Sequence, residues 1–284
     1  MSKALLLLPK IIIQNANALS SPYTIGFPAM TAWLGFTHAL QRKLNKKEFD
    51  KFIVYKTAVV SHDANLQVYK GDGDFVNSII ATANPLDKDG SRSAFIEEAR
   101  VHLKVSLVLE CDGMNKQEED NFFQVLNKML HTMKIAGGNI LHFNKPEIYR
   151  DTSDIFSIRR HLMPGFALIE RRELMKEAMN SGKDALESLL HYSGIHNEYD
   201  EENEKWISKK ATSGWIVPIA VGFQGISELG IAKNQRDPDT LHRFAESIVT
   251  LGEFKMVYKI ESIDEVLWEY EFDQENDLYI CKNN

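Results

Sequence analysis

Cysteine is scarce in this chain of 284 residues, and its two cysteines, Cys111 and Cys281, are far apart. They lack the paired spacing of a redox or zinc site, and the nine histidines show no metal-ligand spacing either. A chain of this length buries about three quarters of its unfolded surface, so it needs no disulfide or structural metal. We therefore expect a reduced, cytoplasmic protein that holds no metal and no cofactor.

Several other sequence signatures are also missing. No window reaches the roughly 18 consecutive apolar residues of a membrane helix, so we expect no membrane contact. Pro9 and Lys10 interrupt the apolar start, and no small-residue cleavage site follows, so residues 5–13 predict a buried strand rather than a targeting segment. The chain has no GxGxxG or P-loop pattern and no serine-hydrolase or kinase signature. The sequence thus predicts no catalytic residues of these classes.

Charge is unevenly distributed along the chain. The net charge of −7 argues against a nucleic-acid partner. Residues 1–172, however, carry 22 basic and 18 acidic residues, whereas residues 173–284 carry 11 and 22. Within residues 1–60 there are eight basic and two acidic residues. This split permits an electropositive face on the first half, with an acidic second half that faces solvent or a protein partner.

Hydrophobic periodicity organises the first half of the chain. Alternation at residues 101–109 predicts a half-buried strand, and residues 5–13 predict a strand covered on both faces. A turn-rich stretch at about 62–99 predicts a protruding, thumb-like hairpin. The order β-α-β, insertion, β-α-β predicts an α+β fold, with a ferredoxin-like (RRM-type) domain at residues 1–150. The expected elements are strands at 5–13, 52–60, 101–109 and 140–143, and helices at 28–44 and 122–133, the second helix capped by Gly137 and Gly138.

The second half, residues 151–284, is less regular, and we expect an α/β unit packed on the first. An acidic linker is expected at about 196–204, and the last short strand at 278–281. The remaining predicted elements are strands at 166–169 and 215–223 and helical stretches at 171–192, 240–251 and 263–269.

Polar residues between the first strand and the first helix form the leading candidate site. Gln14, Asn15, Asn17 and Ser20 are expected in a loop at 14–22, where a scaffold holds short hydrogen-bonding groups. Other residues carry weaker signals. The basic residues Arg100, Lys104, Arg159 and Arg160 suit phosphate contacts or an ordinary solvated face. His38, His102, His142 and His161 could each act as the base in metal-independent RNA cleavage or be plain surface residues.

Longer strings of residues carry a family resemblance. The strings ALLLLPKIIIQNANALSSPYTIGFP and WLGFTHALQRKL resemble the opening of the second-Csy family of type I-F CRISPR systems, the type I-F branch of the Cas-five (RAMP) family. The resemblance continues in order to about Tyr279 through NPLDKDGS, EEARVHLKVSLVL, MKIAGGNIL, RRHLMPGFALI, GWIVPIAVGF, HRFAES and LGEF. The chain departs from the family pattern at residues 161–164, and residues 173–213 match poorly.

The resemblance implies a non-catalytic subunit of the RNA-guided Csy surveillance complex (Cascade) in antiviral defence. Such a subunit would bind and cap the 5′ handle of the crRNA, form a heterodimer with the large Csy subunit and abut the Csy backbone subunit. Its thumb would pack on that neighbour and the guide. Target DNA would be reached only through the complex, because guide pairing reads the sequence.

Eleven residues are assigned to RNA by combining these strings with the polar and basic pattern. Two other functions stay open: a metal-independent endoribonuclease that processes repeat RNA, and an assembly protein with little RNA contact. The assigned RNA-binding residues are Gln14, Asn15, Asn17, Ser20, His38, Arg42, Arg92, Arg100, His102, Arg159 and Arg160.

Overall fold

A single large sheet forms the centre of the molecule. The computed structural model describes residues 3–80, 82–83, 86–93, 95–96, 98–152, 154–235 and 237–283. The fold is mixed α/β with strands dominant, and its 11-stranded sheet has the order β10-β11-β1-β9-β4-β13-β17-β16-β19-β18, with β12 beside β1. The strands are β1 Ala4–Asn17, β4 Ile53–Leu66, β9 Arg100–Asp112, β10 Lys134–Ile135, β11 Gly138–His142, β12 Glu147–Tyr149, β13 Phe166–Glu170, β16 Ile216–Gly225, β17 Ala245–Met256, β18 Trp268–Asp273 and β19 Leu278–Asn283.

The sheet joins the two halves of the sequence. β13 pairs with β4, so the strands of residues 151–284 continue the sheet of residues 1–150. Trp268 of β18 also lies opposite Thr57 of β4, so the pairings from β4 round to β18 close into a ring. Trp268 is fully buried, and its indole N–H donates to the Leu168 carbonyl over 2.8 Å. These contacts hold the second half against the first.

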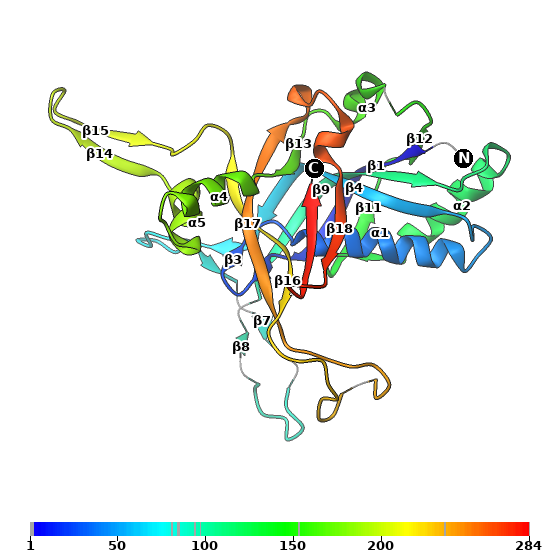
Figure 1. Cartoon of the computed structure of the whole chain (residues 1–284). Helices are drawn as coiled ribbons and strands as arrows, with labels where there is room; N and C mark the ends of the chain where they lie inside the picture. Colours follow the sequence, from blue (N-terminus) through cyan, green and yellow to red (C-terminus); the bar gives the residue numbers. More distant parts are fainter. Residues whose placement is uncertain are drawn as a thin grey trace.

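Helices pack on both faces of the sheet (Figure 1). On one face, α1 and α2 cover Leu6, Leu8 and other β1 residues that form the main core. On the other face, α3 and the 3-10 turns η2 and η3 cover Leu5 and Leu7. Each such fully buried side chain contributes about 1.5–3 kcal/mol to folding. The helices are α1 Met30–Asn45, α2 Glu119–Leu130, α3 Ile155–Leu162, α4 Arg172–Asn180 and α5 Ala185–Ser193, with 3-10 turns η1 Lys116–Glu118, η2 Val257–Lys259 and η3 Ile263–Val266.

Two sets of projections extend from this body (Figure 1). One is a hairpin of β14 His196–Asp200 and β15 Lys205–Lys209. The other lies on a different side and combines the insertion after β4 with the connection between β16 and β17 at residues 226–244. The remaining short strands form hairpins: β2 Leu19–Ser21 with β3 Thr24–Ile25, β5 Val68–Tyr69 with β6 Ser78–Ile79, and β7 Thr82–Ala83 with β8 Phe95–Ile96. Asn84 and Pro85 of the predicted insertion turn lie outside the described residues.

The predicted strands and helices of the first half are all present, but two local interpretations were wrong. Residues 14–17, predicted to be a loop, form the C-terminal end of strand β1, which pairs with β9 as far as Asn17. Gly137 and Gly138 do not cap a helix, because α2 ends at Leu130. Ala136 and Gly137 form the tight turn between β10 and β11, where Gly137 has a φ of 77° that favours glycine, and Gly138 is the first residue of β11.

Three predictions in the second half were also wrong. Residues 196–204 are not a linker but β14 and its turn, which is closed by backbone N–H groups that donate to Asp200. Residues 240–251 are not helical, because the β-branched run at 248–250 lies in β17 and favours a strand. Of residues 263–269, only the short η3 is helical, and β18 then begins at Trp268.

Candidate nucleic-acid interface

One end of the sheet is left uncovered on the face opposite α1 and α2. The helix α3 and the turns η2 and η3 cover only the part of this face around Leu5 and Leu7. Beyond that cover, exposed or half-buried side chains replace the apolar ones along β1, β9, β4 and β11. We call this surface the open face; it consists of Ile12, Gln14, Asn15, Asn17, Asp63, Asn65, Arg100, His102, Lys104, Lys134, Asn139 and His142.

Strand register places these residues on a common face. Lys104 lies opposite Ile12 on β1 and opposite Asp63 on β4, and Ile12 lies opposite His142 on β11. Residues directly opposite each other in neighbouring strands project to the same side of a sheet. These four residues therefore form one row across the sheet, in which Ile12 is 38% exposed. Their neighbours Ile13, Leu103 and Ile140 are buried on the helix-covered face.

A second row centres on His102. His102 lies opposite Asn65 of β4, and its Nδ1 accepts the backbone N–H of Asn15 over 3.1 Å. Asn15 has a φ of 57° at a bulge where the register between β1 and β9 shifts. Gln14 lies opposite Asn139, which in turn lies opposite Lys134. Amides and cations therefore continue across β4, β9, β1, β11 and β10.

The predicted polar residues divide into two groups. Asn17 and Ser20 hold local turns: both polar atoms of the Asn17 amide bond to the Leu19 backbone, and the Ser20 Oγ lies 2.9 Å from the Thr24 Oγ1. Gln14 and Asn15 are exposed, and their side chains form no hydrogen bond within the described part of the chain. Of the predicted polar residues, Gln14 and Asn15 are thus the amides that remain available to a ligand.

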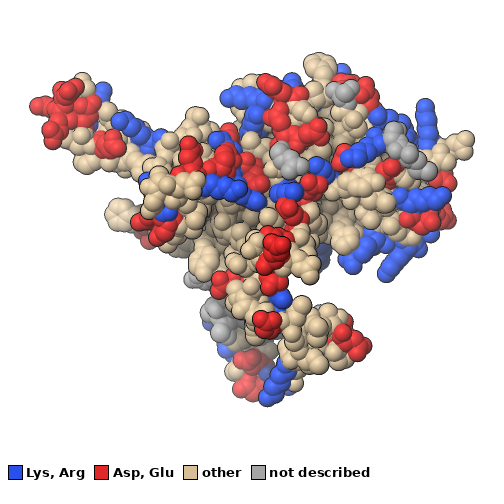
Figure 2. All heavy atoms as spheres, viewed as in Figure 1, with Lys and Arg blue, Asp and Glu red and all other residues tan. Residues whose placement is uncertain are grey.

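The charge of the open face is mainly positive. Lys104 and Lys134 are exposed, and Arg100 is half-buried beside Asn17 with Glu98 as its ion-pair partner. Asp63 is the acidic residue in the Lys104 row. Figure 2 shows acidic side chains gathered at the far end of the β14–β15 hairpin and basic ones around the C-terminal end of α1. Other acidic side chains of the second half lie on β18 of the sheet, at Glu269, Glu271 and Asp273.

Two predicted residues, His38 and Arg42, lie away from the open face. Both are exposed on α1, whereas Trp33 and Leu44 of the same helix are buried, as the helical spacing predicted. Because α1 covers the opposite side of the sheet, the structure does not bring this pair together with Arg100 or His102. His38 instead lines a small pocket.

The other predicted arginines are dispersed. Arg92 is exposed in the insertion between β7 and β8. Arg159 and Arg160 are consecutive on α3, over the covered end of the sheet. Arg160 is exposed, but Arg159 is half-buried and its guanidinium donates to the Ile260 carbonyl. Arg159 therefore ties α3 to the turn after η2.

Sequence reasoning missed a polar cluster at the edge of the open face. His62 of β4 lies with its Nε2 2.7 Å from the Oγ of Ser106, which is fully buried in β9. The His62 Nδ1 lies 2.6 Å from the Pro164 carbonyl and 3.0 Å from the Lys10 Nζ. Burial, together with repulsion from Lys10 and Lys104, lowers the pKa of His62 to about 4. The sequence offered one signal, the break at Pro9 and Lys10 in an apolar strand.

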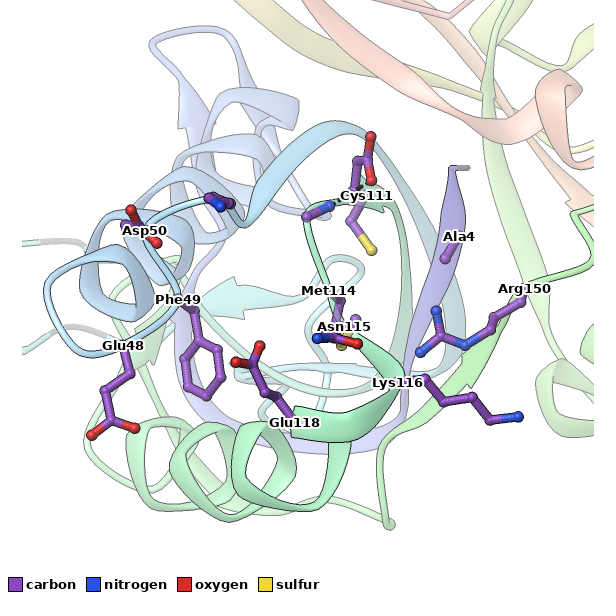
Figure 3. A pocket seen from close by; sticks show the side chains of 13 residues that line it. Ala4, Glu48, Phe49, Asp50, Cys111, Met114, Asn115, Lys116, Glu118 and Arg150 are labelled. Carbon is purple, nitrogen blue, oxygen red and sulfur yellow. Dashed lines mark hydrogen bonds between the residues drawn. The ribbon is translucent and has the colours of Figure 1, made fainter. Parts of the chain in front are cut away.

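A separate pocket of about 540 Å³ lies where β9 ends. Figure 3 shows Lys116 and Arg150 on one side of it and Glu48 and Asp50 on the other. Arg150 already forms an ion pair with Glu119 at 2.8 Å. These opposite charges offset one another, so the lining favours no single ligand charge.

The open face can bind an extended anion with exposed bases. Rows of cations spaced by strand separation suit successive phosphates, and amides suit base edges or sugar hydroxyls. Among the described residues, no group of three His, Cys, Asp or Glu could hold a metal ion. None of the helices in this part of the chain is long and apolar enough to cross a membrane.

Comparisons with known proteins agree with the resemblance. Residues 6–281 match the family model described as CRISPR-associated protein (Cas_Csy2). The chain is also similar to the CRISPR-associated protein Csy2 of Pseudomonas aeruginosa (strain UCBPP-PA14). The two are 31% identical over 98% of this chain and 94% of that protein.

Proposed function

The chain belongs to the Cas_Csy2 family of CRISPR-associated proteins, and we propose that within the type I-F Csy complex it is a non-catalytic, cytoplasmic subunit that binds the crRNA 5′ handle. The open face is the observation that carries this proposal. It presents Lys104, His102 and Gln14 on neighbouring strands, and no helix of the described residues covers them. Single-stranded RNA is recognised on surfaces of this kind, where bases can spread out and phosphates meet cations.

The arrangement of the first half supports an RRM-like lobe at residues 1–150. Its four main strands have the order β11-β1-β9-β4, all antiparallel to their neighbours. The helices α1 and α2 both lie on one face, which leaves the other to a ligand. RRM domains bind RNA on the sheet face that their helices leave free, mostly through the central strands. Here the central strands are β1 and β9, which supply most of the open face.

The exposed side chains of the projections are evidence for protein partners. Phe75 in the insertion is 97% exposed, and Ile231 and Phe244 in the connection 226–244 are 79% and 76% exposed. Exposed apolar side chains in this number mark surfaces that other proteins cover. We assign this pair of projections, which includes the thumb-like insertion, to the backbone subunit. The large subunit and the crRNA are the other proposed partners, and target DNA is reached only through the complex.

Salt dependence of RNA binding tests the proposal. The heterodimer with the large subunit is titrated with handle RNA at increasing salt. If about four phosphates are bound, the logarithm of affinity should fall against log salt with a slope near −3. The Lys104→Ala variant should weaken binding and reduce the magnitude of the slope by about 0.7. Lys128, exposed on α2 on the other side of the sheet, provides the matched control.

Two outcomes would reject RNA binding by the open face. A slope near zero for the native heterodimer would mean that phosphates are not bound. Equal losses in the Lys104→Ala and Lys128→Ala variants would mean that the open face is not the site. Intact assembly without handle binding would favour a protein that only joins other subunits.

A further inference from the structure

Two bulges flank β9 at the same level of the sheet, one in β1 and one in β4. The register between β1 and β9 shifts between Leu8 and Ile11, and the register between β4 and β9 shifts between Ser61 and Asp63. Ile11 and Ser61 both lie opposite Val105, so the bulges flank the same residue of β9. The bulge in β1 contains Pro9 and Lys10, and the bulge in β4 contains His62. Bulges redirect side chains and are frequent beside functional sites.

Both bulges direct polar groups to Ser106. The Lys10 backbone N–H donates to the Ser106 Oγ over 2.9 Å, which Lys10 can do because its φ is 53°. A left-handed backbone costs a non-glycine residue about 1–2 kcal/mol. The Ser106 Oγ also lies 2.7 Å from the His62 Nε2. One buried hydroxyl thus links the two bulges.

Hydrogen-bond geometry fixes the state of the imidazole. A separation of 2.6 Å between the His62 Nδ1 and the Pro164 carbonyl requires the proton to lie on Nδ1. The Nε2 then accepts from the Ser106 hydroxyl, which itself accepts the Lys10 N–H. His62 is therefore neutral and carries its proton on Nδ1. A second proton, on Nε2, would turn the Ser106 Oγ from the donor into the acceptor of that hydrogen bond and would place a cation 3.0 Å from the Lys10 Nζ.

The Lys10 ammonium is held but not neutralised. It donates to the Met163 carbonyl over 3.2 Å, next to the Pro164 carbonyl that His62 holds. The ion pairs within the described residues do not include Lys10. Lys10 and Lys104 are two nearby cations at the edge of the open face, and burial together with repulsion from Lys104 lowers the pKa of Lys10. An ammonium has three donors, so donors remain for an anion.

We propose that Lys10 binds a backbone phosphate of the RNA and that His62 is a positioning residue that holds Lys10 in place. This inference rests on the proposed function. The His62 imidazole fixes the 163–165 connection through Pro164, and that connection fixes the ammonium through Met163. Lys10 and Lys104 then provide two phosphate contacts next to the bases read by the amides of the open face.

Substitutions in the heterodimer with the large subunit test this inference with handle RNA. Lys10→Ala should weaken binding about tenfold and reduce the magnitude of the salt slope by about 0.7. His62→Ala should weaken binding less, and should add nothing in the Lys10→Ala background, because it acts through Lys10. His62→Asn keeps a donor where Nδ1 lies and should retain most of the affinity. His62→Gln, which reaches only toward Ser106, should not.

The outcomes separate this inference from the proposed function. A native heterodimer that binds handle RNA without salt dependence would reject the proposed function itself. If Lys104→Ala reduces the slope but Lys10→Ala does not, only the role of Lys10 is rejected. Additive losses from Lys10→Ala and His62→Ala would reject the positioning role of His62. Thermal unfolding of each variant identifies those that weaken binding through loss of the fold.

Discussion

The backbone N–H of Asn15 donates to the Nδ1 of His102 over 3.1 Å, and this bond ties a bulge of β1 to β9. It requires an unprotonated Nδ1 on His102. It also requires Asn15 to adopt a φ of 57°, which asparagine tolerates better than most residues. The backbone and the side chain of Asn15 therefore have separate roles, because the backbone bonds to His102 while the amide projects into solvent.

Substitution of Asn15 can separate these two roles. Asn15→Gly relaxes the backbone and should leave the free energy of unfolding within a few tenths of a kcal/mol. Asn15→Ala keeps a Cβ in a left-handed conformation and should lower the free energy of unfolding by about 1 kcal/mol. Both remove the amide, so both should weaken handle RNA binding equally. Denaturant unfolding and RNA titration measure the two effects, and native affinity in Asn15→Gly would show that the amide makes no RNA contact.

Acid should destabilise the protein through His62. Its folded pKa of about 4 lies below the ordinary value of 6.5, so the unfolded chain binds this proton first as pH falls. The stabilisation is therefore complete above pH 6.5 and is lost as pH falls toward 4. After allowance for partial solvent exposure, the loss by pH 5 should be about 1 kcal/mol. The charged groups that face His62 are Lys10 and Lys104, and Asp63 is the nearby carboxylate of β4.

Comparison with a variant isolates the histidine from other titrating groups. Denaturant unfolding at pH 7.5, 6 and 5 is measured for the native protein and for His62→Asn. The native protein should lose more stability over this range than the variant does. Parallel curves would contradict a neutral His62 in the folded state.

The strong elements of the first half could be predicted because their patterns are local. Alternation in residues 101–109 and the apolar stripe of α1 depend only on which side chains face the core. The residues of β17 also contain apolar spacings compatible with 3.6 residues per turn, and these spacings wrongly predict a helix. The pairing with β13 and β16 determines its strand conformation, and that pairing is not local.

The open face could be predicted only in part. Gln14, Asn15, Arg100 and His102 were identified and lie together, but His38 and Arg42 lie on the helix-covered side. The bulges that redirect Lys10 and His62 depend on how three strands meet, so no spacing along one strand indicates them.

We expect no cleavage of CRISPR repeat RNA by this protein. Metal-independent cleavage needs a base and an acid that converge on one phosphate. The four candidate histidines are dispersed: His38 is on α1, His161 lies 3.3 Å from Glu147 beside β12, and His102 and His142 occupy different rows of the open face. Incubation of the protein with repeat RNA in a chelator should leave the RNA intact. Cleavage that disappears in one His→Ala variant would instead establish the endoribonuclease function.

The β14–β15 hairpin should be dispensable for folding. The ring centroids of Tyr199 and Trp206 lie 5.6 Å apart, but Tyr199 is 50% exposed and Trp206 is 71% exposed. The hairpin therefore buries little surface of its own. An isolated two-stranded hairpin is only marginally stable in water. Replacement of residues 197–208 by a short Gly-Ser linker should therefore change the Tm by less than about 2 °C. Trp206→Ala, compared with substitution of the buried Trp268, serves as the control. A fall of about 5 °C or more on deletion would mean that the hairpin packs on the body of the protein.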